Sequence, residues 1–185
     1  RSILFPYTTL FRSCLAYLAS RLAENHVVCG NQAGKIPFYF HILETDLLLN
    51  PEQSLIDVIY KALSPNIASS HLPKLAKFIQ NELRSNNALL LIDGIDELYR
   101  HEADIVIGFI EKVIGQFPDL KIIATSSPHY SGKLNALGFV NLPLSPLSNR
   151  SVRQLNQKWV ENWYKSILTA GNALQTFSKE KLLAN

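Results

Sequence analysis

The sequence has no methionine, only two cysteines and few charged residues. Charged residues make up 18% of the chain, below the roughly 25% typical of globular proteins. Cys14 and Cys29 cannot form a disulfide framework, which favours a reducing compartment. No apolar run approaches the roughly 20 residues that a membrane-spanning helix needs. We therefore expect a packed cytoplasmic domain that has no membrane partner.

The basic charge balance is uninformative about partners. Arg1 and Arg12 supply two of the three net positive charges, and the first thirteen residues contain no acid. The balance of the remaining chain therefore indicates neither a nucleic-acid partner nor a membrane surface. An unprocessed translated chain starts with methionine, so we expect this chain to be a fragment.

Apolar runs and helical spacings alternate along the chain, which predicts a doubly wound parallel α/β sheet. After residue 147 no strand pattern follows, so residues 148–185 are expected to start a helical subdomain. We expect strands at 36–43, 88–93, 120–126 and 138–144. We expect helices at 14–26, after Asn50-Pro51, at 72–83, 103–114, 148–168 and 173–183.

The strand at 88–93 ends in a cluster of acids. Asp93 follows five apolar residues, and Asp96 and Glu97 come just after it. Ligands of open parallel sheets bind outside the carboxyl ends of the strands. Magnesium prefers oxygen ligands and keeps several waters, so Asp93 is a candidate metal ligand. Gly94 would let the chain approach phosphates, and Asp96 and Glu97 would orient or deprotonate a water.

An interpretation without a ligand is also open. Asp93 would then cap a loop, and Asp96 and Glu97 would start the next helix, whose dipole favours acids. The combination of these acids with Gly94 favours nucleotide chemistry over this alternative.

The order of residues 93–97, Asp-Gly-Ile-Asp-Glu after an apolar run, resembles the acidic box of the NACHT family of signal-transduction NTPases. Other segments are similar to further family motifs. The segment 35–43 resembles the second core strand, 121–128 the sensor strand, 142–164 the link into the helical subdomain, and 182–185 a later motif. The resemblance covers roughly residues 14–185.

The resemblance implies a P-loop NTPase fold and an ATP-dependent switch. The intact parent would bind ATP with Mg²⁺, hydrolyse it, associate with itself on activation and relay a signal between attached sensor and effector domains. Asp93 would serve the metal, Asp96 and Glu97 the attacking water, and Thr125 and Ser126 the sensor region near the nucleotide.

One residue departs from the family pattern. Ser127 stands where the sensor strand usually carries arginine, and a hydroxyl cannot neutralise a phosphate as a guanidinium does. His129 or Lys133 could substitute, but a solvated loop is the favoured interpretation for both. The departure therefore argues against tight coupling between phosphate state and conformation.

The sequence lacks a phosphate loop of the form Gly-x-x-x-x-Gly-Lys-Ser/Thr. Residues 30–36 have one residue too few between their glycines, and residues 131–134 have no hydroxyl after the lysine. The family places this loop directly before the helix that starts near Cys14. Residues 4–13 stand there instead, and they contain neither glycine nor lysine. We therefore expect no tight ATP binding by this chain.

Residues 4–13 also resemble one translated frame of a widely used sequencing adapter. We expect residues 1–13 to be an artefact that replaces the first strand and the phosphate loop, ahead of a nucleotide-binding core at 14–147. A signal peptide is a rival interpretation, although Pro6 and Arg12 interrupt its apolar region. An edge strand is another, because Thr, Tyr and Phe favour strands.

Several other residues carry no chemistry in this interpretation. Leu155, Trp159 and Trp163 lie four apart and predict the buried stripe of a helix. Cys14 and Cys29 are expected to be buried or half-buried thiols. The five histidines show no metal spacing, so zinc is not expected.

Two rival functions remain. One is another AAA-like P-loop ATPase, which attached domains would distinguish from a signalling switch. The other is a non-catalytic scaffold that keeps the fold, and Ser127 favours it.

Overall fold

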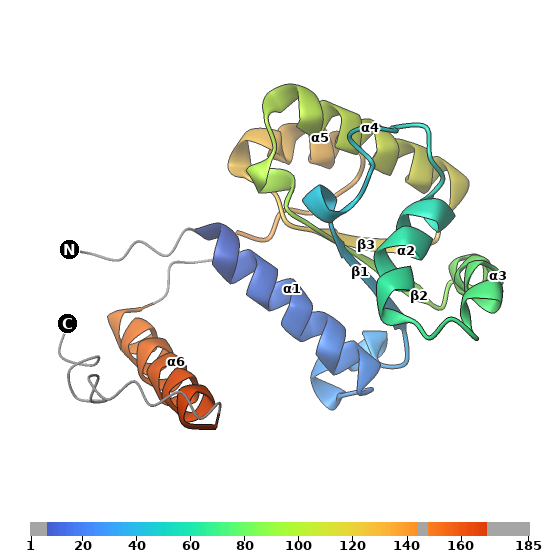
Figure 1. Cartoon of the computed structure of the whole chain (residues 1–185). Coiled ribbons are helices and arrows are strands. Elements are labelled where there is room, and N and C mark those ends of the chain that lie inside the picture. The colour runs from blue at the N-terminus through green and yellow to red at the C-terminus, as the bar shows by residue number, and fades with distance from the viewer. Residues whose placement is uncertain (1–6, 144–147, 170–185) are drawn as a thin grey trace. The chain divides into compact units, whose positions relative to one another are not determined.

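The structure is a computed structural model that describes residues 7–143 and 148–169. The chain divides into two units after Asn141, and each is described by itself. The first unit contains a parallel three-stranded sheet in the order β1-β2-β3 (Figure 1). The strands are β1 at Ile36–His41, β2 at Ala88–Asp93 and β3 at Lys121–Ala124. The expected parallel α/β sheet is confirmed.

Helices connect the strands. The α-helices of the first unit are α1 (Tyr7–Ala23), α2 (Leu55–Leu63), α3 (Leu72–Arg84), α4 (Arg100–Gln116) and α5 (Ser131–Ala136). Its short 3₁₀ turns are η1 (Val27–Gln32), η2 (Ile42–Glu44), η3 (Ser64–Asn66), η4 (Ile95–Glu97) and η5 (Pro128–Tyr130). The described part of the second unit contains α6 (Asn149–Thr169).

The strand β2 is buried on both faces and forms the centre of the unit. All six of its residues are buried, as its unbroken apolar run predicts. Alternate residues point to opposite faces. Leu90 and Ile92 pack into the larger apolar cluster with α2, α3 and α4, whereas Leu89 and Leu91 pack against α1. The sheet therefore has helices on both faces.

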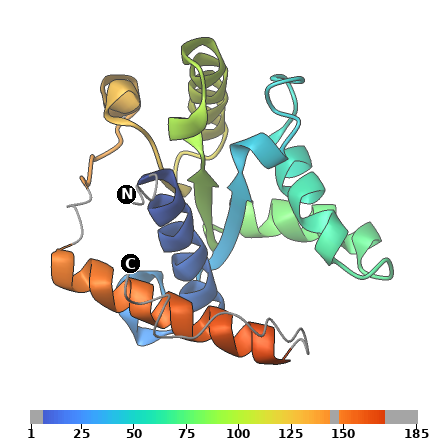
Figure 2. The same cartoon turned by 60° about the vertical axis from the view of Figure 1, so that its left-hand side comes forward.

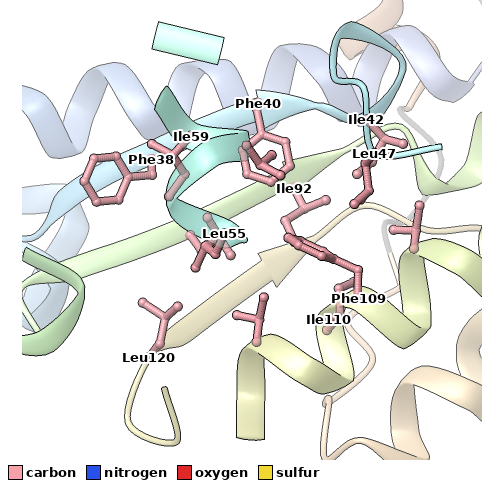
Figure 3. Packing of buried hydrophobic residues seen from close by; sticks show 14 of the residues in the cluster. Phe38, Phe40, Ile42, Leu47, Leu55, Ile59, Ile92, Phe109, Ile110 and Leu120 are labelled. Atoms are coloured by element: carbon pink, nitrogen blue, oxygen red, sulfur yellow. The ribbon is translucent and has the colours of Figure 1, made fainter. Parts of the chain in front are cut away.

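The larger cluster fixes β1, α2 and α4 relative to β2. Phe38 and Phe40 from β1 and Ile92 from β2 lie beside Leu55 of α2 and Phe109 of α4 (Figure 3). These side chains are almost completely buried. Burial of a side chain of this size contributes about 1.5–3 kcal/mol, so this face supplies most of the apolar stabilisation.

The helix α1 starts earlier than expected. Residues 7–13 are helical, so the alternative of an edge strand is wrong for these residues. One face of α1 is apolar and packed, because Leu15 and Leu22 are buried and Leu18 packs beside them. Cys14 on the same helix is exposed, contrary to expectation, and Cys29 is half-buried. The helix α1 therefore forms although no glycine-lysine phosphate loop stands ahead of Cys14.

Two element boundaries differ from the sequence prediction because of capping. The helix α2 starts at Leu55 rather than directly after Asn50-Pro51. The Ser54 hydroxyl accepts from the Asp57 amide at 3.2 Å, and the Asp57 carboxylate accepts from the Ser54 amide at 3.3 Å. Similarly, α4 starts at Arg100, where the Glu102 carboxylate accepts a hydrogen bond from the Tyr99 amide.

The strand expected at 138–144 is wrong for its described residues, 138–143. Gly138 has a φ of 89°, and the Phe139 amide donates to the Leu134 carbonyl at 3.1 Å. This left-handed glycine ends α5 in the manner of a helix C-cap. Phe139 then packs against the larger cluster. Phe139 therefore completes the helix cap, whereas Val140 and Leu142 are exposed.

The buried stripe expected on α6 is also wrong where it can be described. Leu155 and Trp159 are exposed, Trp159 to 57%. The side chain of Trp163 and the helix expected at 173–183 lie outside the described residues. Across 7–143 and 148–169, helices of the length and apolarity required for crossing a bilayer do not occur.

Candidate functional site

The polar residues that are buried in the described part of the chain gather at one edge of the sheet. They are His41, Asp93 and Thr125. His41 and Asp93 are register partners at the ends of β1 and β2, and Thr125 directly follows β3. The strands are parallel, so all three residues lie at the carboxyl edge, toward which the arrows of β1 and β2 point in Figure 2. This edge is where ligands of open α/β sheets bind.

Asp93 is held by hydrogen bonds from both neighbouring strands. Its side chain is 1% exposed. The Thr125 hydroxyl donates to Oδ1 at 2.6 Å, and the Tyr39 hydroxyl donates to Oδ2 at 3.1 Å. A carboxylate has about four acceptor positions, so these two bonds leave further capacity on both oxygens. Asp93 is therefore fixed in position, and its two oxygens keep unused lone pairs.

Thr125 connects Asp93 to the turn that follows it. Its hydroxyl oxygen accepts a hydrogen bond from the Gly94 amide at 3.0 Å while donating to Asp93. The threonine hydroxyl thus uses its donor inside the protein. Its predicted role in the sensor region stays a prediction, and any effect on a ligand would pass through Asp93 or Gly94.

Gly94 is required by the space around it as well as by its backbone. Its φ is 92°, a left-handed conformation that side chains rarely adopt. A Cβ atom built there would lie 2.5 Å from both Cε1 and Nε2 of His41. The glycine therefore lets the chain turn directly over the histidine ring.

The two acids after Gly94 lie in η4, ahead of α4. Asp96 and Glu97 thus lie in the first helical turn after β2, as the alternative without a ligand expects, although α4 itself starts only at Arg100. Burial raises the pKa of the Asp96 carboxyl, and the nearby charges of Glu97 and Asp93 raise it further, against the lowering by its backbone hydrogen bond. Oε1 of Glu97 lies 3.5 Å from Nε2 of His41. Asp96 and Glu97 thus follow the end of β2 closely enough for the charges of Asp93 and Glu97 to act on Asp96.

Ser126 and Ser127, which directly follow Thr125, make local contacts. The Ser126 hydroxyl donates to the Ser127 carbonyl, and the Ser127 hydroxyl accepts from the His129 amide at the start of η5. Lys133 pairs with Asp104 of α4 rather than lying unpaired in solvent. Ser127 thus caps a turn.

The donor set fits part of a magnesium–nucleotide site. Asp93 and Glu97 offer the oxygen atoms that Mg²⁺ prefers, and one carboxylate that acts through waters suffices when phosphates complete the coordination. In the parts of the chain that are described, three or more acidic, histidine or cysteine side chains do not gather into a metal site. Residues 4–13 contain no glycine or lysine to hold phosphates. The two carboxylates are thus compatible with a hydrated Mg²⁺, whereas residues 4–13 lack the glycine and lysine of a phosphate loop.

The sequence located Asp93 and its acidic neighbours but missed Tyr39 and His41. Both lie on β1, more than fifty residues before the acids they contact. The available signal was the position of His41 at the end of an apolar run, matching the position of Asp93 at the end of the next. Comparisons with known proteins add no relative, since no family model, curated protein or solved structure matches this chain.

Proposed function

We propose that this chain carries the metal-facing half of a NACHT-type, ATP-dependent signalling switch. In this proposal Asp93 serves hydrated Mg²⁺, Asp96 and Glu97 the attacking water, and Gly94, Thr125 and Ser126 the nucleotide side. The observation that carries the proposal is a buried carboxylate, fixed from both sides, at the carboxyl end of the central strand. The parent would be a cytoplasmic ATPase that self-associates and relays a signal to attached domains.

The placement of α1 supports a lost strand and loop next to this edge. The helices joining β1 to β2 and β2 to β3 cover one face, and α1 covers the other. In Figure 2, the first turn of α1 lies toward the edge at which the strand arrows point. The helix thus has the direction expected after a phosphate loop.

The handedness of strand connections specifies where that strand would lie. Nearly all parallel crossovers are right-handed, so crossovers on opposite faces advance in opposite directions along a sheet. A strand ahead of α1 would then pair with the free edge of β3. The loop between that strand and α1 would pass the carboxyl end of the sheet, beside Asp93.

A non-catalytic scaffold is the second candidate. The observation that favours it is Ser127, which caps η5 and brings no positive charge to the site. A scaffold would keep the fold and lose turnover. Another AAA-like ATPase would share the same edge chemistry and differ in its attached domains.

Titration calorimetry of the 185-residue chain with MgATP tests the first part of the proposal. We expect no binding at micromolar concentrations, because one carboxylate site cannot replace the amides and lysine of a phosphate loop. Submicromolar affinity would contradict this expectation.

A second experiment tests the switch against the scaffold. Residues 1–13 are replaced by the strand and loop encoded in the source genome, and ATP hydrolysis is compared with that of the Asp93→Ala variant. Hydrolysis that requires Asp93 supports the switch. Binding without hydrolysis supports the scaffold, and neither binding nor hydrolysis contradicts both proposals.

A further inference from the structure

His41 is a buried histidine for which the proposed function has no role. It lies at the end of β1, is 2% exposed, and pairs in register with Asp93 across the two strands. A polar ring is buried only where its nitrogen atoms find partners. The partners of this ring therefore indicate what it does.

The backbone determines which nitrogen of His41 carries the proton. The Leu43 amide donates a hydrogen bond to Nδ1 at 3.3 Å. A backbone N–H can only donate, so Nδ1 must present its lone pair. In the neutral ring the proton is then on Nε2. The turn η2, which immediately follows β1, thus selects one tautomer.

The protonated nitrogen faces the candidate catalytic acid. Nε2 lies 3.5 Å from Oε1 of Glu97, whose side chain is 26% exposed. The ring also fills the space that a Cβ at Gly94 would need. The ring cannot turn far, because the Leu43 amide lies at one nitrogen and the Gly94 backbone against the other side.

We propose that His41 is a positioning residue that holds the carboxylate of Glu97 at the carboxyl edge through Nε2–H. The histidine is part of β1, so the position of the acid is set by the neighbouring strand and not only by the turn after β2. The consequence for water activation rests on the proposed function, whereas the contact itself does not.

Nitrogen-15 NMR of the histidine rings tests the contact in the 185-residue chain. The chain is labelled at histidine and observed in alkaline buffer, where neutral rings show distinct signals for protonated and bare nitrogens. The His41→Gln variant assigns the signals. We expect Nε2 of His41 to be protonated and Nδ1 to be bare.

Variants of the acid complete the test. Glu97→Ala should shift the Nε2 and Hε1 signals of His41, and Glu97→Gln, which keeps an acceptor oxygen, should restore most of the shift. Glu44→Ala is the matched control, because it removes an exposed carboxylate from the segment after β1. A bare Nε2, or an equal response to Glu97→Ala and Glu44→Ala, would overturn the proposal.

This readout involves no nucleotide, so its failure is distinguishable from a failure of the proposed function. A chain that hydrolyses no ATP after restoration of its loop can still show the Glu97-dependent signal of His41. If a restored chain hydrolyses ATP and the His41 ring signals do not change in the Glu97→Ala variant, only the positioning role is contradicted.

Discussion

Residues 93–97 and the first turns of α1 lie toward the same edge of the sheet. The first segment carries the residues of a candidate binding site, and the second lacks those of a phosphate loop. At 93–97, Asp93 is fixed by a hydrogen bond from Thr125 and Gly94 has a left-handed backbone. Residues 7–13 form a helix that contains neither the glycine nor the lysine of a phosphate loop. The comparison shows that a helix can occupy its place in a fold without the chemistry of a binding loop.

Gly94→Ala should have the largest effect on the acidic side of the comparison. A left-handed backbone costs a residue with a side chain about 1–2 kcal/mol, and the overlap with His41 adds about 1–3 kcal/mol. We expect urea unfolding to show a loss of about 3–4 kcal/mol.

Gly108→Ala is the control for this substitution. Gly108 lies in α4, and a Cβ there would meet nothing within 4 Å. Alanine at this helical position should stabilise the chain by about 0.5–1 kcal/mol. Equal effects at Gly94 and Gly108 would contradict both the left-handed backbone at Gly94 and the overlap with His41.

Leu22→Ala should have the next largest effect and concerns α1. Leu22 is almost completely buried against the second apolar cluster. Removal of a buried leucine side chain costs about 2–5 kcal/mol, and we expect about 3 kcal/mol by urea unfolding. The same substitution at the exposed Leu49 should change stability by less than about 0.5 kcal/mol. If Leu22→Ala is equally mild, α1 is not held against the sheet.

Thr125→Val should have an intermediate effect. The variant keeps the shape of the side chain but leaves the Gly94 amide without its acceptor and Asp93 without a donor. An unsatisfied buried group costs about 1–3 kcal/mol, so we expect a loss of about 2 kcal/mol. Thr125→Ser keeps the hydroxyl and should lose less. A smaller loss for valine than for serine would indicate that the hydroxyl contributes nothing.

Asp96→Asn should have the smallest effect, and it should depend on pH. The pKa of the folded Asp96 carboxyl lies above its ordinary value of 3.8, mainly because of burial. Between pH 3.8 and the raised pKa of the folded state, the folded chain therefore binds more protons than the unfolded chain. The free energy of unfolding falls as the pH rises through this range.

The asparagine variant removes this loss. It should be more stable than the parent at neutral pH, by less than about 1 kcal/mol because solvent screens the partly exposed carboxylate. The advantage should disappear below pH 3.8. Unfolding curves at several pH values measure the difference, and an advantage that grows in acid would contradict the sign.

The sequence prediction succeeded where a local pattern determines the element. The strand at 88–93 could be predicted with both of its ends, because a run of apolar residues is buried on both faces. The strand expected at 138–144 failed because Gly138 caps a helix, and the early start of α1 shows that residues 7–13 accept helical structure. The pattern at Leu155 and Trp159 matched a helix but gave the wrong exposure.

The candidate site divides in the same way. Asp93, Gly94, Asp96 and Glu97 are adjacent in sequence and could be recognised together. The contacts of Tyr39 and His41 with them depend on the pairing of β1 with β2 in one register. Local residue patterns place His41 and Asp93 at the ends of apolar runs, but the contacts themselves follow only from the strand register.

The most direct test of the central claim is the source DNA across the codons for residues 4–14. We predict that independent reads of that genome replace the adapter-like codons by ones that encode a strand and Gly-x-x-x-x-Gly-Lys-Ser/Thr directly ahead of Cys14. Reads that continue unbroken from the codons for residues 4–13 into Cys14 would contradict the claim that the acidic edge has lost a phosphate-binding partner.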